Sequence, residues 1–111
     1  MSDVLHVETL LDLAGDEVDT FLPIVEDFQE NGTQLLQQIT TCVAASDLAG
    51  IRAAAHQLKG SSGMLGMTLL YEQCQEIEHR ELSAISPDFT SALQSTFQRS
   101  VQLAMETLHH A

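Results

Sequence analysis

The residues best suited to chemistry gather around one histidine, His56, in the segment Ala53–Gly66, which reads AAAHQLKGSSGMLG. Each residue advances about 100° around a helix, so residues three and four apart share a face. On that geometry one stripe combines the histidine with two basic residues and two glycines: Arg52, His56, Lys59, Gly60 and Gly63. A second stripe is small or apolar throughout and should face a core: Leu48, Ile51, Ala55, Leu58 and Ser62. His56 is therefore expected on a helix, outside the core face and between two positive charges.

This stripe has the three properties that a phosphoryl carrier needs. An imidazole that a partner's active site can reach is able to act as a nucleophile. Arg52 and Lys59 can offset the negative charge of the phosphoryl oxygens. Glycine costs roughly 1 kcal/mol in a helix interior relative to alanine, so Gly60 and Gly63 indicate that something approaches the helix backbone closely. The partner can supply the positioning and the metal ion, so the carrier needs neither metal nor nucleotide of its own.

Other chemistries find less support in the sequence. It contains no Walker A motif, no GxGxxG and no kinase ATP site, so the chain is not expected to phosphorylate itself from ATP. His56 has no acidic, Cys or Ser partner in a motif that would indicate a hydrolytic triad. The remaining histidines are interpreted as surface or tail residues: His6, His79, His109 and His110. A metal-binding helical bundle stays open as an alternative, and it predicts thermal stabilisation by zinc or iron.

Composition narrows the class of protein. A chain of 111 residues with 44% hydrophobic residues and two prolines is expected to form a single helical domain, residues 1–111. A net charge of −12 argues against binding to nucleic acid or to anionic membranes. Cys42 and Cys74 form no CxxC motif and are interpreted as reduced, mostly buried thiols. Without a signal peptide or an apolar run that could cross a bilayer, a cytoplasmic location is expected.

Hydrophobic periodicity predicts five helices. We place them at Val4–Ala14, Glu17–Ala45, Leu48–Met64, Met67–Leu82 and Asp88–Leu108. Asp3, Asp16 and Asp47 are candidate N-caps, Gly15 ends the first helix, and Ser83–Pro87 is expected to be a loop. Four long amphipathic helices with short connections predict an all-α fold. We expect an antiparallel up-down four-helix bundle with a short additional N-terminal helix at one end.

The second helix contains two potential breaks. Pro23 falls early, before its missing N–H matters to much of the hydrogen-bond ladder. The pair Asn31-Gly32 can form a turn that would split the segment into two helices. The apolar stripe keeps its phase across this pair, with Gly32 on the apolar face. One continuous helix is therefore favoured, with Gly32 allowing close packing.

The segment from His56 to Ser62, HQLKGSS, resembles the H-x-L-K-G-S-S signature of the histidine-containing phosphotransfer (HPt) domains of bacterial and fungal phosphorelays. The flanking residues also fit the family: an alanine pair before the histidine, then Gly66, Leu70, Cys74, Ile77 and Glu78. The similarity covers about Leu5–Leu108. It implies the same four-helix bundle that the periodicity predicts.

The resemblance also implies roles for three residues. The residue matching His56 accepts a phosphoryl group from an aspartyl phosphate on a receiver domain and passes it to another receiver aspartate. Lys59 matches the lysine that steadies the phosphoryl group. Glu78 matches a position on the next helix that orients the imidazole. As a hydrogen-bond acceptor, Glu78 would hold the proton on one ring nitrogen and leave the other free to attack.

A docking surface is expected around this site. Gly60 matches the glycine that leaves room for the receiver loop, and Gln57, Ser61 and Ser62 match positions at or beneath the docking face. We expect the surface to combine residues of the His56 stripe with apolar residues of the first two helices: Arg52, Gln57, Gly60, Ser61, Gly63, Leu10, Leu11, Leu13 and Leu22. The alternative for the four leucines is that they belong to the core.

The expected partners are response-regulator receiver domains and a hybrid sensor histidine kinase, with the chain itself a monomer. No cofactor is expected on the chain, and Mg²⁺ is expected only on the receiver. The alternative function is an HPt-like adaptor that binds a receiver or enzyme without carrying phosphate. An intact His-x-x-Lys-Gly makes the adaptor the less favoured reading, because a pure binder has no need of the nucleophile. Whether the chain is a free-standing carrier or a domain of a hybrid kinase stays open.

Overall fold

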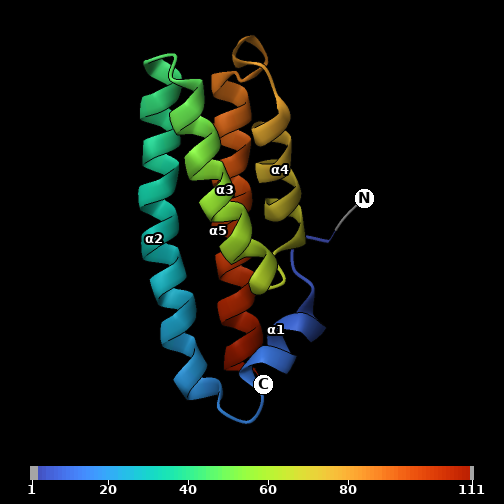
Figure 1. The fold of residues 1–111 in the computed structure, drawn as a ribbon. Coiled ribbons are helices and arrows are strands. Elements are labelled where there is room, and N and C mark those ends of the chain that lie inside the picture. Colours follow the sequence, from blue (N-terminus) through green and yellow to red (C-terminus); the bar gives the residue numbers. More distant parts are fainter. Residues whose placement is uncertain (1–2, 111) are drawn as a thin grey trace.

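Five α-helices and one short 3-10 helix form the fold in a computed structural model that describes residues 3–110. The elements are α1 (Val7–Ala14), α2 (Val18–Ala44), α3 (Leu48–Met64), α4 (Thr68–His79), η1 (Leu82–Ala84) and α5 (Pro87–His109). Helices α2 to α5 run alternately up and down side by side, while α1 lies across the lower end of the bundle (Figure 1). The predicted up-down bundle with a short N-terminal helix is therefore confirmed.

The core forms along the apolar stripes of the four long helices. α3 is central to it, because it packs mainly on α4 and α2. Its predicted apolar stripe is buried at Ile51, Ala55, Leu58 and Ser62, and Leu48 is half-buried. Ser62 is tolerated there because its hydroxyl donates to the carbonyl oxygen of Leu58 at 2.6 Å. Burial of this stripe leaves the opposite side of α3, which carries His56, facing solvent.

Helix α2 is continuous through Asn31-Gly32, as predicted. Gly32 is buried, and a Cβ atom at this position would collide with the ring of Phe97 on α5. That ring also packs against Phe28, with 5.5 Å between ring centroids. The glycine therefore serves close contact between α2 and α5.

Several predicted helix ends were wrong. α1 begins at Val7 rather than Val4, and its N-cap is the imidazole of His6, which accepts from the backbone N–H of Thr9, rather than Asp3. α2 has Glu17 at its N-cap without a side-chain hydrogen bond, so Asp16 does not cap it. Local composition cannot resolve such ends, because several neighbouring residues can serve as a cap.

The end of α4 was also misplaced, because the predicted helix ran on to Leu82. α4 stops at His79, and Leu82–Ala84 form η1 inside what was expected to be helix and loop. In contrast, Asp47 caps α3 by accepting from the N–H of Gly50, as predicted. Pro87, which was expected to end the loop, is the first residue of α5, one residue before the predicted start at Asp88.

The turn between α3 and α4 holds the N-terminal segment in place. Gly66 adopts a φ of 77°, a backbone conformation that glycine takes without steric cost. Its carbonyl oxygen accepts from the N–H of His6 at 2.6 Å. This contact fixes the start of α1 beside the C-terminal end of α3.

Candidate functional site

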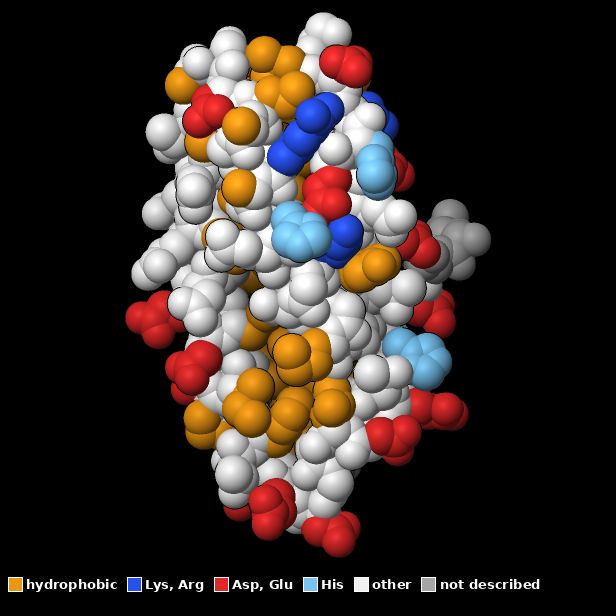
Figure 2. Space-filling view, viewed as in Figure 1, with side chains coloured by type: hydrophobic (Ala, Val, Ile, Leu, Met, Phe, Trp, Pro, Cys, Tyr) orange, Lys and Arg blue, Asp and Glu red, His pale blue; other side chains and the backbone are white. Residues whose placement is uncertain are grey.

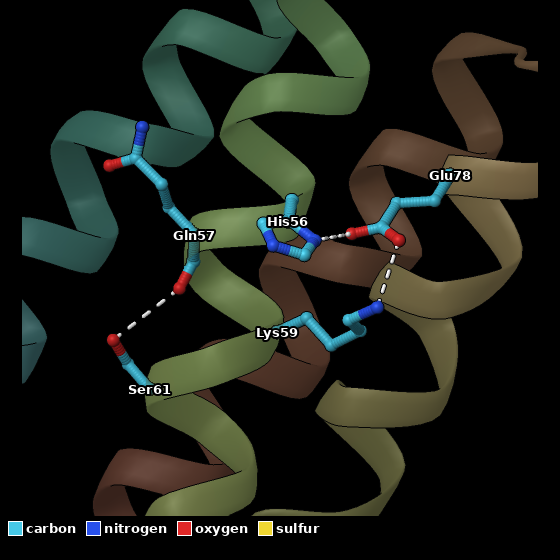
Figure 3. Close-up of polar contacts among 5 residues, drawn as sticks. All are labelled: His56, Gln57, Lys59, Ser61 and Glu78. Carbon is cyan, nitrogen blue, oxygen red and sulfur yellow. Dashed lines mark hydrogen bonds and ion pairs between the residues drawn. The ribbon is translucent and has the colours of Figure 1, made fainter.

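His56 lies midway along α3 and meets a carboxylate from α4. The imidazole Nδ1 lies 2.9 Å from Glu78 Oε1 (Figure 3). The side chain of His56 is 72% exposed, whereas that of Glu78 is 14% exposed. The imidazole is therefore open to a partner on one side and held from beneath on the other.

The contact with Glu78 decides which ring nitrogen is reactive. An ionised carboxylate can only accept hydrogen bonds, so the proton of a neutral imidazole sits on Nδ1. The lone pair is then on Nε2, which points away from Glu78 in Figure 3. The arrangement presents a nucleophilic nitrogen to solvent.

Lys59 shares the same carboxylate. Its Nζ lies 2.9 Å from Glu78 Oε2, and its side chain is 19% exposed. This hydrogen bond is the main reason that the pKa of Lys59 is raised above its ordinary value. Burial acts to raise the pKa of Glu78, but the hydrogen bonds from Lys59 and His56 outweigh it, so that pKa is lowered. Glu78 is therefore ionised at neutral pH and bridges the two residues of α3.

Arg52 stands on the same face one turn before His56 but makes a different contact. It is half-buried, and its Nη2 donates to the backbone carbonyl oxygen of Arg80 at 3.2 Å, just past the end of α4. A carbonyl at a helix C-terminus lacks an intrahelical partner, so this bond stabilises the end of α4. Arg52 also borders an open hollow lined by His56, Glu78 and His79.

The small and polar residues of the stripe leave the surface beside His56 open. A Cβ atom at Gly60 would meet nothing within 4 Å. Gln57 and Ser61 are exposed, and the Ser61 hydroxyl donates to the Gln57 carbonyl oxygen at 3.4 Å. In Figure 3, the side chains of Gln57 and Lys59 extend from opposite sides of α3. A partner can therefore approach the backbone at Gly60 without displacing a side chain.

Gly63 differs from Gly60, although both are exposed on the same stripe. A Cβ atom at Gly63 would lie 3.1 Å from Cδ2 and 3.3 Å from Cε2 of Tyr71 on α4. The expectation that Gly63 serves an approaching partner stays a prediction, and the structure adds a second reason for a glycine here. There, the close neighbour is a side chain of the same molecule.

The predicted apolar docking residues divide into two groups. Leu10 is fully buried in the core, so its assignment to a docking surface was wrong. Leu22 is half-buried and packs against the core. Leu11 and Leu13 are exposed on α1. Consecutive leucines on a short helix cannot be told apart by sequence, because the buried face depends on how the helix crosses the bundle.

Further exposed apolar residues were missed. Met64 at the end of α3 is 64% exposed, and Ile24 on α2 is 47% exposed. They border a groove of about 200 Å³ between α2 and α3, whose floor includes Phe28, Leu35 and Leu58. Figure 2 shows an apolar patch below the central histidine, on the same face. Met64 follows His56 by eight residues, about 12 Å along the helix. This short spacing from His56 could have been recognised in the sequence.

The two cysteines and the possible metal ligands form no second chemical site among residues 3–110. Cys42 and Cys74 are free thiols, and burial raises the pKa of Cys74 to about 12. Within residues 3–110, no group of three or more His, Cys, Asp or Glu side chains is arranged to hold a metal ion. No helix in this part of the chain is long and apolar enough to span a membrane.

An exposed imidazole, oriented through one nitrogen and mounted on an up-down helical bundle, has the geometry that a phosphoryl carrier requires. A family model of the Hpt domain matches residues 23–110. The chain therefore belongs to the Hpt domain family.

Two known proteins illustrate this relationship. The sensor protein TorS of Escherichia coli (strain K12) is 38% identical over 60 residues, which make up 54% of this chain and 7% of TorS. The crystal structure of the histidine-containing phosphotransfer protein B (HptB) from Pseudomonas aeruginosa PAO1 matches with a TM-score of 0.86 and 21% identity. The match covers 100% of this chain and 99% of that one. At that identity the structural match establishes the fold.

Proposed function

We propose that Nε2 of His56 accepts the phosphoryl group from an aspartyl phosphate on a receiver domain and passes it to the aspartate of another receiver. The observation that carries this assignment is the 2.9 Å contact between His56 Nδ1 and Glu78 Oε1 beneath a largely exposed ring. It leaves the lone pair on the accessible nitrogen.

The transfer balances without a cofactor on this chain. Nε2 attacks phosphorus, the bond to the aspartate oxygen breaks, and that carboxylate leaves with the electron pair. The Nδ1 proton stays in its hydrogen bond to Glu78, which stabilises the charge that develops on the ring. Return transfer breaks the N–P bond and restores the lone pair. The Mg²⁺ that supports this chemistry is assigned to the receiver, and no ATP-dependent kinase activity is assigned to this chain.

Lys59 supplies positive charge to the phosphoryl group in this proposal. In the free protein its Nζ is bound to Glu78 Oε2, so the side chain must rotate to reach a group on Nε2. Phosphorylation adds a negative charge close to His56. The phosphoryl oxygens then compete with Glu78 for the ammonium group.

The receiver docks, in this proposal, over Gly60 and the apolar groove between α2 and α3. Ile24 and Met64 border the groove, and Leu11 and Leu13 are exposed on α1. The proposed location is the cytoplasm, since the two free thiols suit a reducing compartment. The proposed working form is a monomer.

The test of docking compares apolar residues of different burial. Met64→Ala should weaken binding to a receiver while leaving the melting temperature almost unchanged, because Met64 is exposed. Leu10→Ala should destabilise the fold by about 2–5 kcal/mol. A Met64→Ala variant that binds the receiver as tightly as wild type would contradict the placement of the interface.

The carrier assignment is tested by phosphotransfer from a radiolabelled receiver to wild type and His56→Gln. Acid-labile, alkali-stable label on wild type alone supports it. Receiver binding without label on wild type would instead favour a non-phosphorylated adaptor.

A further inference from the structure

The ring of Tyr71 occupies an unusual position on α4, between a glycine and a lysine of α3. It is partly exposed, yet one edge fits against Gly63 so closely that a Cβ atom there would lie 3.1 Å from the ring. A contact that short is tighter than ordinary packing, so with an alanine the ring would have to shift by a few tenths of an ångström. The glycine thus lets the aromatic ring rest against the backbone of α3.

Lys59 lies one helical turn before Gly63, and its ammonium group stands near the same ring. Its Nζ is 6.0 Å from the ring centroid of Tyr71 and 2.9 Å from Glu78 Oε2. Tyr71 precedes Glu78 by seven residues, so the two side chains share a face of α4 about 10 Å apart. Lys59 therefore reaches α4 between a carboxylate on one side and an aromatic ring on the other.

We infer that Tyr71, seated on Gly63, is a positioning residue that keeps Lys59 next to His56. A lysine side chain is flexible and loses considerable rotamer entropy when it is held in one place. The ring fills the space toward the C-terminal end of α3, where the ammonium group would otherwise be free to move. A lysine released from Glu78 is then directed toward the phosphoryl group rather than away from it.

This inference rests on the proposed function for its effect on phosphotransfer, but the placement of Lys59 can be measured without any transfer. The first measurement is an NMR titration of the Lys59 ammonium group. Its pKa is raised chiefly by the hydrogen bond to Glu78. In Tyr71→Ala the lysine should spend less time at that carboxylate, so the pKa should fall toward its ordinary value. Tyr71→Phe keeps the ring but loses the phenol, whose charge also raises this pKa, so the pKa should fall less than in Tyr71→Ala.

The two glycines of α3 supply a matched pair for the same titration. Gly63→Ala should shift the ring and lower the pKa of Lys59, by less than Tyr71→Ala does. Gly60→Ala adds the same methyl group to the same helix, where it meets nothing within 4 Å. Because both changes raise helix propensity equally, an effect confined to Gly63→Ala isolates the contact with the ring. Equal titration of Lys59 in all four variants and wild type would overturn the inference.

The second measurement is phosphotransfer from a receiver. Tyr71→Ala should slow it by about two- to fivefold, the effect of an exposed cation–π contact, while Tyr71→Phe stays close to wild type. In a Lys59→Ala background, Tyr71→Ala should add no further loss. A loss that persists without Lys59 would show that Tyr71 acts on docking instead, and would overturn its positioning role. Failure of wild type to accept phosphate would refute the proposed function, while the titration would still decide on Tyr71.

Discussion

Two clusters, one between α3 and α4 and the other at the end of α4, each pair a basic side chain with a glutamate but serve different purposes. At the centre of the bundle, His56 and Lys59 share Glu78, and one ring nitrogen of the histidine is left open to solvent. At the end of α4, Arg80 donates to Glu76 and to the carbonyl oxygen of Ala84. Its guanidinium group also lies 4.3 Å from the ring centroid of Phe89.

The difference lies in what the contacts leave free. The contacts of Arg80 fasten the loop after α4 to the start of α5. In the His56 cluster, Glu78 holds one side of the imidazole and leaves the reactive side unbound. The exposed ion pair between Arg80 and Glu76 contributes little to stability by itself. The central cluster therefore has its value in orientation, whereas the terminal cluster has its value in packing.

The largest effect expected from this comparison is at His56. His56→Gln should abolish phosphate acceptance, because the amide has no nucleophilic nitrogen, and should leave the fold intact since the side chain is exposed. Labelling by a phosphorylated receiver measures the first effect, and circular dichroism the second. Arg80→Ala is the matched control and should still be labelled. Loss of labelling in both variants would erase the distinction between the clusters.

The next effect concerns Glu78. Glu78→Ala should slow transfer by about tenfold to a hundredfold, because the imidazole loses its orientation and its fixed proton. Glu78→Gln can still accept the hydrogen bond from Nδ1 but loses the charge, so a smaller loss is expected. Single-turnover rates of phosphotransfer for wild type, Glu78→Gln and Glu78→Ala would measure these losses. Identical rates would show that the contact with Glu78 does not orient the reacting ring.

Arg80→Ala should act on stability. The loss of the ring contact and the carbonyl hydrogen bond is expected to lower the free energy of unfolding by about 1–2 kcal/mol. Urea denaturation monitored by circular dichroism measures this change. Glu76→Gln removes the exposed ion pair alone and should change stability much less. An equal loss of stability in both variants would show that the ion pair, and not the packing of Arg80, stabilises this end of α4.

The smallest effect is the pH dependence contributed by Glu78. Its pKa is lowered in the folded protein, so its contribution to stability is fully present above the ordinary glutamate pKa of about 4.3. That contribution is lost as the pH falls through the lowered value. The stability difference between wild type and Glu78→Gln should therefore shrink between pH 5 and the acid end of the titration. A difference that grows on acidification would reverse the sign and refute the linkage.

The site was only partly accessible from sequence. Periodicity placed His56 on the solvent side of α3 because the opposite stripe is apolar, and this follows from helical geometry alone. The role of Glu78, 22 residues away, came from the family resemblance. The missed features, Met64 and the ring of Tyr71 against Gly63, depend on distances between helices that no local pattern contains.

Four long amphipathic helices, and the apolar face of each, follow from the sequence, because these properties depend on residues three and four apart. Which neighbours those faces meet depends on how the helices pack. Crossing of α1 over the bundle buried Leu10 and exposed Leu11. The approach of α4 to α3 brought one carboxylate to both His56 and Lys59. Local periodicity selects a face, but the partner on that face is set by long-range packing.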